Sequence, residues 1–261
     1  VTADSTVKPV FSINSYTISL SSDGNGSVEG AGDYNYSSTA TVTASPNTGY
    51  DFVNWTDENG NEVSTSATYS FTVSGARSLK ANFALYSYNI GVTAGDHGSV
   101  TGKGIYYYGE SITVKAKPET GYHFVNWTID GNVVSTNANY TFTVSGPADL
   151  KANFAINSYT VKFVNDDGTL LKEAQFVYGS TAFYHVNETP KKKPTVQYTY
   201  TFAGWDKKLG AVTDDITYTA TYEATVNKYK ITFKNEDGTV LQISEVEYGK
   251  LPVYEKDTPT K

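Results

Sequence analysis

Histidine is the side chain in this sequence best suited to proton transfer or metal binding near neutral pH. Its three copies, His97, His123 and His185, stand in three unrelated sequence contexts. The sequence therefore offers no Ser/His/Asp or Cys/His set that could pair a nucleophile with its base. Cysteine is absent, which excludes disulfides and thiolate metal ligands. We predict no catalytic, no cofactor-binding and no metal-binding residue, and hence a protein that is not an enzyme and carries no cofactor.

Acidic residues beside glycine form the second group to weigh, because clustered carboxylates can bind calcium. Asp166 and Asp167 precede Gly168, and Asp237 precedes Gly238. Their spacing lacks the alternating oxygen ligands and the terminal Glu of an EF-hand loop. An Asp-Gly pair between two apolar runs is typical of a β-hairpin, so we predict turns at both places.

Lysine supplies two further candidates. The run Lys191-Lys192-Lys193 is either a basic contact patch or a solvated loop, and we predict the loop. Lys80 with Asn82, and Lys151 with Asn153, have the residue types of an intramolecular isopeptide bond. Residues two apart on one strand cannot bridge two elements, so we predict no such bond from either pair.

Tyrosine is unusually frequent, at 22 residues. Tyr106, Tyr107 and Tyr108 are consecutive, so in a strand Tyr107 faces away from its two neighbours and at least one ring should be exposed. The pairs Tyr34/Tyr36, Tyr86/Tyr88 and Tyr198/Tyr200 add further rings. Exposed rings can stack on sugars or contact proteins, whereas the simpler interpretation is that they cover the rim of a small core.

The tyrosines return with a period of about seventy residues, which indicates a tandem repeat. Each unit opens with a tyrosine that starts an alternating run: Tyr16, Tyr88, Tyr159 and Tyr229. A second tyrosine follows in each unit, at Tyr36, Tyr108, Tyr178 and Tyr248. Three units also contain one tryptophan: Trp55, Trp127 and Trp205. A fixed period of this kind predicts an array of small modules.

Each unit is predicted to consist of β-strands. Tyr159, Val161 and Phe163 would point to one face of an extended chain, and Thr160 and Lys162 to the other. Such alternation predicts a half-buried strand. No segment has the pattern of a helix of three turns.

The run Gly-Tyr-x-Phe-Val-Asn-Trp occurs at 49–55 and again at 121–127. In a regular strand the Trp would face away from the Tyr and Phe. We predict a bulge at Asn54, Asn126 and Gly204 that returns each Trp to the core as its largest side chain. In the third unit Gln197 stands before Tyr198, at the place of the Gly, which leaves the local turn there open.

The repeat sets the predicted domain boundaries. We expect the closing strand of a preceding repeat over 1–14, complete modules over 15–85 (module 1), 86–156 (module 2) and 157–226 (module 3), and the first half of a fourth repeat over 227–261 (the half-module). The chain contains no Met, and its end units are incomplete, so we expect a segment of a longer array. The apolar face of the half-module should pair with a neighbouring chain, pack on module 3 or be partly disordered.

Charge and hydropathy restrict the partners. The net charge of −7 argues against nucleic acid and anionic membranes. No apolar run approaches the roughly 18 residues of a membrane span, so we predict no membrane insertion. We expect a monomer, with self-association through the half-module as the open alternative.

Module 3, with Tyr159-Thr-Val-Lys-Phe163 and Tyr200-Thr-Phe-Ala-Gly-Trp205, resembles the internalin B-repeat, also called the Listeria–Bacteroides repeat. The half-module is similar to the first half of that repeat. Modules 1 and 2, with Leu79-Lys-Ala-Asn-Phe83 and Leu150-Lys-Ala-Asn-Phe154, resemble its divergent form. The resemblance implies mainly β, β-grasp-like modules with little or no helix, on secreted or wall-attached bacterial proteins.

Three functions remain open at this point. The first is a non-enzymatic, semi-rigid stalk or spacer at the bacterial cell surface or in a secreted protein, whose partners are the neighbouring domains of its own polypeptide. The second is an adhesin module that binds a host protein or glycan through exposed tyrosines. The third is an accessory region of a secreted carbohydrate-active enzyme.

Overall fold

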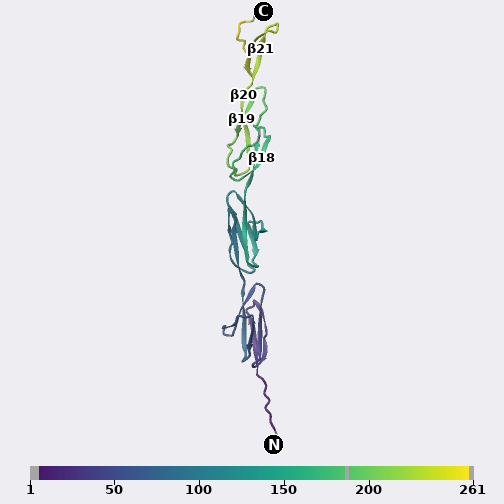
Figure 1. The fold of residues 1–261 in the computed structure, drawn as a ribbon, viewed down its shortest axis with the longest axis vertical. Coiled ribbons are helices and arrows are strands. Elements are labelled where there is room, and N and C mark those ends of the chain that lie inside the picture. Colours follow the sequence, from purple (N-terminus) through teal and green to yellow (C-terminus); the bar gives the residue numbers. More distant parts are fainter. Residues whose placement is uncertain (1–5, 186–187, 259–261) are drawn as a thin grey trace. The chain divides into compact units, whose positions relative to one another are not determined.

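The computed structural model describes residues 6–185 and 188–258 (Figure 1). Regular structure in these residues consists of β-strands, and no helix occurs among them. The predicted fold class, a mainly β array of small modules, is therefore confirmed. Contacts divide the chain into two compact units, one of residues 1–117 and 124–153 and the other of 118–123 and 154–261.

Module 1 consists of two sheets. One has the strand order β3-β1-β8-β5-β6, and the other has the order β2-β4-β7. Their strands are β1 (Ser15–Ser22), β2 (Gly26–Glu29), β3 (Gly32–Asn35), β4 (Thr39–Pro46), β5 (Tyr50–Thr56), β6 (Glu62–Ser64), β7 (Thr68–Thr72) and β8 (Arg77–Leu85).

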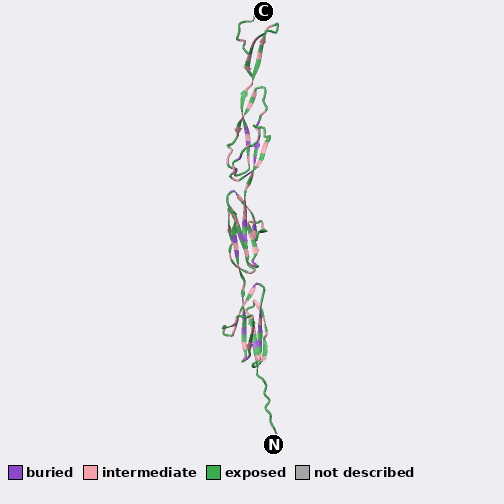
Figure 2. Cartoon of the chain, in the orientation of Figure 1, coloured by how far each residue is buried: buried purple, intermediate pink, exposed green. Residues whose placement is uncertain are grey.

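Alternation along the strands of module 1 brings one face of each sheet into a shared core. Ile18 of β1 and Leu79 of β8 pack with Ala40 and Val42 of β4, and Trp55 of β5 completes the cluster. All five are at most 2% exposed. In Figure 2 the buried residues, drawn in purple, lie along the strands.

The predicted bulge before the tryptophan is present, one residue earlier than expected. Pairing of β5 with β8 skips Val53, between Phe52 and Asn54. Val53 is 44% exposed, and Trp55 behind it is fully buried. An extra residue in one strand reverses the facing of all that follow, so the skipped valine returns the indole to the core.

Module 2 repeats this arrangement, with sheets β11-β9-β16-β13-β14 and β10-β12-β15. Trp127 is fully buried, like its counterpart in module 1. The strands are β9 (Ser87–Ala94), β10 (Gly98–Thr101), β11 (Gly104–Tyr107), β12 (Ser111–Pro118), β13 (Tyr122–Ile129), β14 (Asn132–Ser135), β15 (Asn139–Thr143) and β16 (Ala148–Ile156).

Module 3 has one sheet, of order β18-β17-β20-β19. Its strands are β17 (Ser158–Val164), β18 (Leu170–Val177), β19 (Tyr198–Trp205) and β20 (Ile216–Val226). Irregular segments that carry Ala182, Tyr184 and Val212 cover its apolar face. Phe163 is the fully buried centre of this core, whereas Trp205 is only half-buried. The prediction of a Trp as the largest buried side chain is thus confirmed in modules 1 and 2 and wrong in module 3.

The two end segments are less regular. Residues 6–14, which the sequence predicted to include a closing strand, form no strand, and Val10 is 96% exposed. A strand needs a neighbouring backbone to bond, and no described strand pairs with this segment. The half-module is a hairpin of β21 (Lys228–Lys234) and β22 (Val240–Glu247), with Ile243 52% exposed.

Candidate functional site

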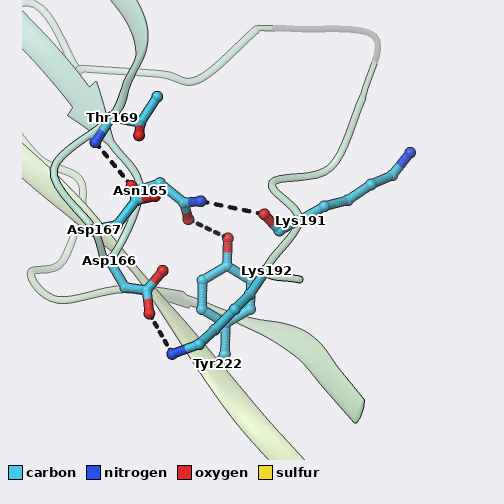
Figure 3. A network of polar contacts seen from close by, with 7 residues as sticks. All are labelled: Asn165, Asp166, Asp167, Thr169, Lys191, Lys192 and Tyr222. Carbon is cyan, nitrogen blue, oxygen red and sulfur yellow. Dashed lines mark hydrogen bonds and ion pairs between the residues drawn. The ribbon is translucent and has the colours of Figure 1, made fainter. Parts of the chain in front are cut away.

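A cluster of polar side chains in module 3 joins the turn after β17, the loop before β19 and strand β20 (Figure 3). Asn165 lies at its centre. Its Oδ1 accepts a hydrogen bond from the Tyr222 hydroxyl at 2.5 Å, and its Nδ2 donates to the Lys191 carbonyl at 3.2 Å. Its backbone closes the turn by donating to the Thr169 carbonyl at 2.8 Å and accepting from the Gly168 N–H at 3.0 Å. One amide side chain therefore ties the loop and β20 to the turn.

Lys192 fastens the same loop a second time. Its ammonium contacts Asp166 Oδ2, and it lies 4.6 Å from the centre of the Tyr200 ring. The hydrogen bond to Asp166 raises the pKa of Lys192 against the opposing effect of burial. A lysine held as a cation is not a nucleophile, so the contact can only bind and orient. The predicted loop is confirmed, because residues 191–193 form no regular structure; the Lys191 side chain is 80% exposed, and that of Lys192, which pairs with Asp166, is 35% exposed.

Tyr222 behaves as a hydrogen-bond donor in this cluster. Burial raises its pKa, and the charges of Asp166 and Asp167 raise it further. The phenol therefore stays protonated and donates to Asn165 over the whole neutral range. The hydroxyl thereby ties β20 to the turn after β17, as Lys192 ties the loop, and the cluster acts as a structural clasp.

The predicted hairpin turns are confirmed at both Asp-Gly sites. Asp167 Oδ1 accepts from the Thr169 N–H at 2.9 Å, and Asp237 Oδ1 accepts from the Thr239 N–H at 2.8 Å. The hydroxyl and the N–H of Thr169 lower the pKa of Asp167, and the N–H and the hydroxyl of Thr239 lower the pKa of Asp237. The turns join β17 to β18 and β21 to β22, which are antiparallel pairs. In the described parts of the chain, no group of three or more acidic, His or Cys side chains could hold a metal ion.

The three histidines lie in three different places. His97 occupies a turn position with a φ of 66°. His123 Nδ1 is 2.9 Å from Asn157 Oδ1, at the end of module 2. His185 lies in module 3, where its carbonyl accepts a hydrogen bond from Lys172 at 3.1 Å. The structure does not bring them together.

The asparagines of the Lys/Asn pairs hold strands together. Asn82 Nδ2 on β8 donates to Asn54 Oδ1 at 2.9 Å and to Thr56 Oγ1 at 3.2 Å on β5. In module 2, Asn153 Nδ2 donates to Asn126 Oδ1 at 2.8 Å. These amides stabilise the strand pair beside the bulge.

The tyrosine triplet behaves as its alternation predicts. Tyr106 and Tyr108 are half-buried, while Tyr107 is 57% exposed. Ile105, on the same face of β11, is 74% exposed. At the equivalent places in module 1, β3 carries Asp33 and Asn35, so module 1 lacks this small apolar patch.

A hollow of about 360 Å³ lies in module 1 between β1, β8 and the loop after β5. Its acidic loop residue Asp57 accepts backbone N–H groups from Asn59 at 2.9 Å and Asn61 at 2.8 Å. These bonds, that of Asn61 first, lower the pKa of Asp57. The carboxylate thus shapes its own loop.

Sequence reasoning missed the cluster around Asn165, since its members are up to 57 positions apart. A signal was present in the repeated pattern Asn165-Asp-Asp-Gly-Thr169 and Asn235-Glu-Asp-Gly-Thr239. The first residue of each pattern donates its backbone N–H to the carbonyl of the last. No helix capable of crossing a membrane is found in residues 6–185 and 188–258.

Comparison with known proteins adds relatives and a family. A provisionally named Gly-rich membrane protein of Evansella cellulosilytica is 31% identical over 58% of this chain and 18% of its own length. A second membrane protein of that organism is 26% identical over 86% of this chain and 34% of its length. The chain thus spans a minor part of both relatives.

Two solved structures are similar at low identity. The Bacillus anthracis TIE protein aligns at 10% identity with a TM-score of 0.34, over 81% of this chain and 51% of its own. Domains 3–4 of the Streptococcal High Identity Repeats in Tandem, from a cell surface protein, align at 15% identity with a TM-score of 0.22, over 54% and 99%.

The family match falls on modules 1 and 2. The model of the Divergent InlB B-repeat domain matches residues 16–87 and 88–158, which together make up more than half of the chain. Modules 1 and 2 are also the ones whose sequences resemble the divergent form. That module 3 and the half-module have the standard form of the repeat stays a prediction. The chain belongs to the family of divergent InlB B-repeat proteins.

Proposed function

We propose that this chain is a non-enzymatic, extracellular spacer, a semi-rigid stalk that presents other domains of a bacterial surface or secreted protein. The observation that supports it is the parallel pairing of the first and last strands of every complete module. These pairs are β1 with β8, β9 with β16 and β17 with β20. Two adjacent parallel strands bring the chain in at one end of a module and out at the other.

The register gives the length that one module adds. In module 1, Ile18 lies opposite Arg77, while the pair begins at Ser15 and ends at Leu85. At the strand rise of about 3.3 Å per residue, entry and exit are separated by about 36 Å. An antiparallel pair would have returned the chain to its starting point.

Each module also encloses its own core, so modules can be added without new contacts between cores. Stability in such arrays is a sum over units and their neighbours. Family membership and relatives named as membrane proteins support a place at the bacterial envelope. The proposed partners are the neighbouring domains of the same polypeptide.

Small-angle scattering on the chain and on a variant that lacks residues 86–156 tests the proposal. The deletion joins Leu85 to Asn157 and so keeps the period. We expect a maximum dimension of about 100 Å or more, shortened by about 36 Å in the variant. A radius of gyration near 18 Å, the value for a compact globule of this length, would contradict a spacer.

The second candidate is an adhesin module, and the exposed pair Ile105 and Tyr107 on β11 favours it. A flat ring beside an aliphatic side chain can contact a sugar face or a protein. The Tyr107→Asn variant installs the residue type that module 1 carries at Asn35. Binding on a glycan array that Tyr107→Asn abolishes would support this candidate, and a blank array would remove its sugar version.

A further inference from the structure

We propose that modules 1 and 2 each end in a docking surface for the tyrosine of the next module, built around the glycine directly before β5 or β13. This docking surface would make the proposed spacer stiffer, so its functional role rests on the proposed spacer function. It identifies the next module as the partner and names the contacts that orient it.

The backbone of one linker residue is bonded on both sides at every joint. The Tyr86 N–H donates to the Gly49 carbonyl at 2.8 Å, and the Tyr86 carbonyl accepts from the Tyr108 N–H at 2.9 Å. The same two bonds recur at 2.8 Å through Asn157, between Gly121 and Tyr178, and through Asn227, between Gln197 and Tyr248. A residue bonded to the module before it and to the module after it is a joint and not a free tether.

A side-chain contact accompanies the backbone bonds at the same place in each joint. The Tyr86 hydroxyl lies 3.5 Å from Asp51 Oδ1. The later joints have His123 with Asn157 at 2.9 Å and Thr199 with Asn227 at 2.6 Å. The interacting groups differ from joint to joint: phenol with carboxylate, imidazole with amide, and hydroxyl with amide. In every joint, however, the contact involves the linker residue and the second residue after Gly49, Gly121 or Gln197. The contact is therefore a regular feature of the repeat.

The glycine makes room for the aromatic ring of the following module. Gly49 has a φ of 88°, and a Cβ atom there would lie 2.3 Å from Cδ1 of Tyr108. Gly121 has a φ of 86°, and its Cβ would lie 2.2 Å from Cδ1 of Tyr178. Only glycine permits both the left-handed backbone and the contact with the ring.

Gln197 takes the glycine's place at the third joint, and the tyrosine there is less covered. Tyr248 is 45% exposed, whereas Tyr108 and Tyr178 are half-buried. Tyr36, whose linker residue Asn14 follows a segment without strands, is 50% exposed. Coverage of the ring thus accompanies the glycine, and the third joint keeps its backbone bonds while its tyrosine ring is more exposed.

Spin labels across the first joint test the inference on the full chain. The sequence has no Cys, so Thr72→Cys and Thr143→Cys place two nitroxides at equivalent exposed ends of β7 and β15. Electron–electron distance measurements should give a narrow distribution. Gly49→Ala and Tyr108→Ala should each broaden it by about twofold, since a freed linker samples many orientations.

The matched control is Gly60→Ala. Gly60 has a φ of 82°, close to that of Gly49, but a Cβ there has nothing within 4 Å. It carries the same backbone strain without a ring contact and should leave the distribution narrow. Circular dichroism checks that each variant keeps its strands, and Tyr108→Ala carries the test if Gly49→Ala unfolds.

A wild-type distribution as broad as that of Tyr108→Ala would overturn the inference, and so would unchanged widths in both joint variants. A loose joint would leave the shortening of the 86–156 deletion intact, because that result depends on the strand pairing within each module. The spin-label distances thus test the docking surface, and scattering by the deletion variant tests the spacer independently.

Discussion

Modules 1 and 3 cover the same kind of sheet in two different ways. Both pair their first strand in parallel with their last, and both have a bulge before the tryptophan. Module 1 covers the apolar face with a second sheet, β2-β4-β7, whose backbone groups bond to one another. Module 3 covers it with irregular segments, of which 179–182 and 210–212 are joined by the bridge Thr181–Ala211 and by the backbone bonds that flank it. The loop before β19 is fastened by side chains instead, through the polar cluster around Asn165.

Modules 1 and 3 also differ in which aromatic side chain lies at the centre of the core. In module 1 the indole of Trp55 is fully buried. In module 3 the ring of Phe163 is at the centre, with Trp205 at 4.8 Å and Tyr218 at 5.3 Å between ring centroids. An irregular cover encloses a large indole less completely than a sheet does, and packed rings supply the missing contacts.

The largest expected effect tests this difference in burial. Trp55→Ala removes a fully buried side chain and should cost about 3–5 kcal/mol, enough to unfold module 1. Trp205→Ala removes a half-buried one and should cost about 2 kcal/mol in module 3. Amide hydrogen exchange reports each module separately, and module 2 is the internal control. Equal losses in the two variants would contradict the comparison.

Tyr222→Phe tests whether side chains hold the cover of module 3. The change leaves Asn165 Oδ1 without its donor and should cost about 1 kcal/mol in module 3 alone. Faster exchange at the amides of residues 191–195 is the local measurement. Tyr200→Phe, which keeps the ring beneath Lys192, is the matched control and should have no such effect. Equal exchange in the two variants would show that the cluster does not fasten the loop.

Alkaline pH should weaken module 3 through the same cluster. The pKa values of Lys192 and Tyr222 are both raised in the folded state. Folding therefore favours the protonated forms, and their contribution is complete below the unfolded values of about 10. It is lost as the pH rises through the folded values. The unfolding temperature of module 3 should fall between pH 9 and 11 more steeply in the wild type than in a Lys192→Met/Tyr222→Phe variant, and parallel curves would argue against this role.

The repeat could be derived from the sequence because its signals are local. Period-two alternation located β17, and Asp-Gly pairs located its turn to β18. The choice between a second sheet and an irregular cover could not be derived, because it depends on pairing across tens of residues. The contact of Lys192 with Asp166 also joins residues far apart in the sequence, and so does the packing of the Tyr108 ring against Gly49. Alternation assigns a face to a side chain without naming its partner.

The smallest effect is expected for two aspartates, one in the first turn of module 1 and one in the first turn of module 3. Asp23 accepts from the Asn25 N–H at 3.0 Å and from the Phe83 N–H of β8 at 2.9 Å, so it joins the turn to the closing strand. Asp167 accepts the Thr169 N–H at 2.9 Å, a bond within its own turn. Asp23→Ala should cost about 1 kcal/mol in module 1, and Asp167→Ala should cost less in module 3.

The pH dependence of the stability of module 1 tests the role of Asp23 separately. Burial acts to raise the pKa of Asp23, but the N–H groups of Phe83 and Asn25 outweigh it and the pKa is lowered. Its contribution is therefore present above the unfolded value of about 3.9 and is lost as the pH falls through the folded value. Urea unfolding of module 1 between pH 5 and 3 should become less dependent on pH in Asp23→Ala. An unchanged slope would mean that the bond to β8 does not stabilise the module, and the two aspartates would then be equivalent turn formers.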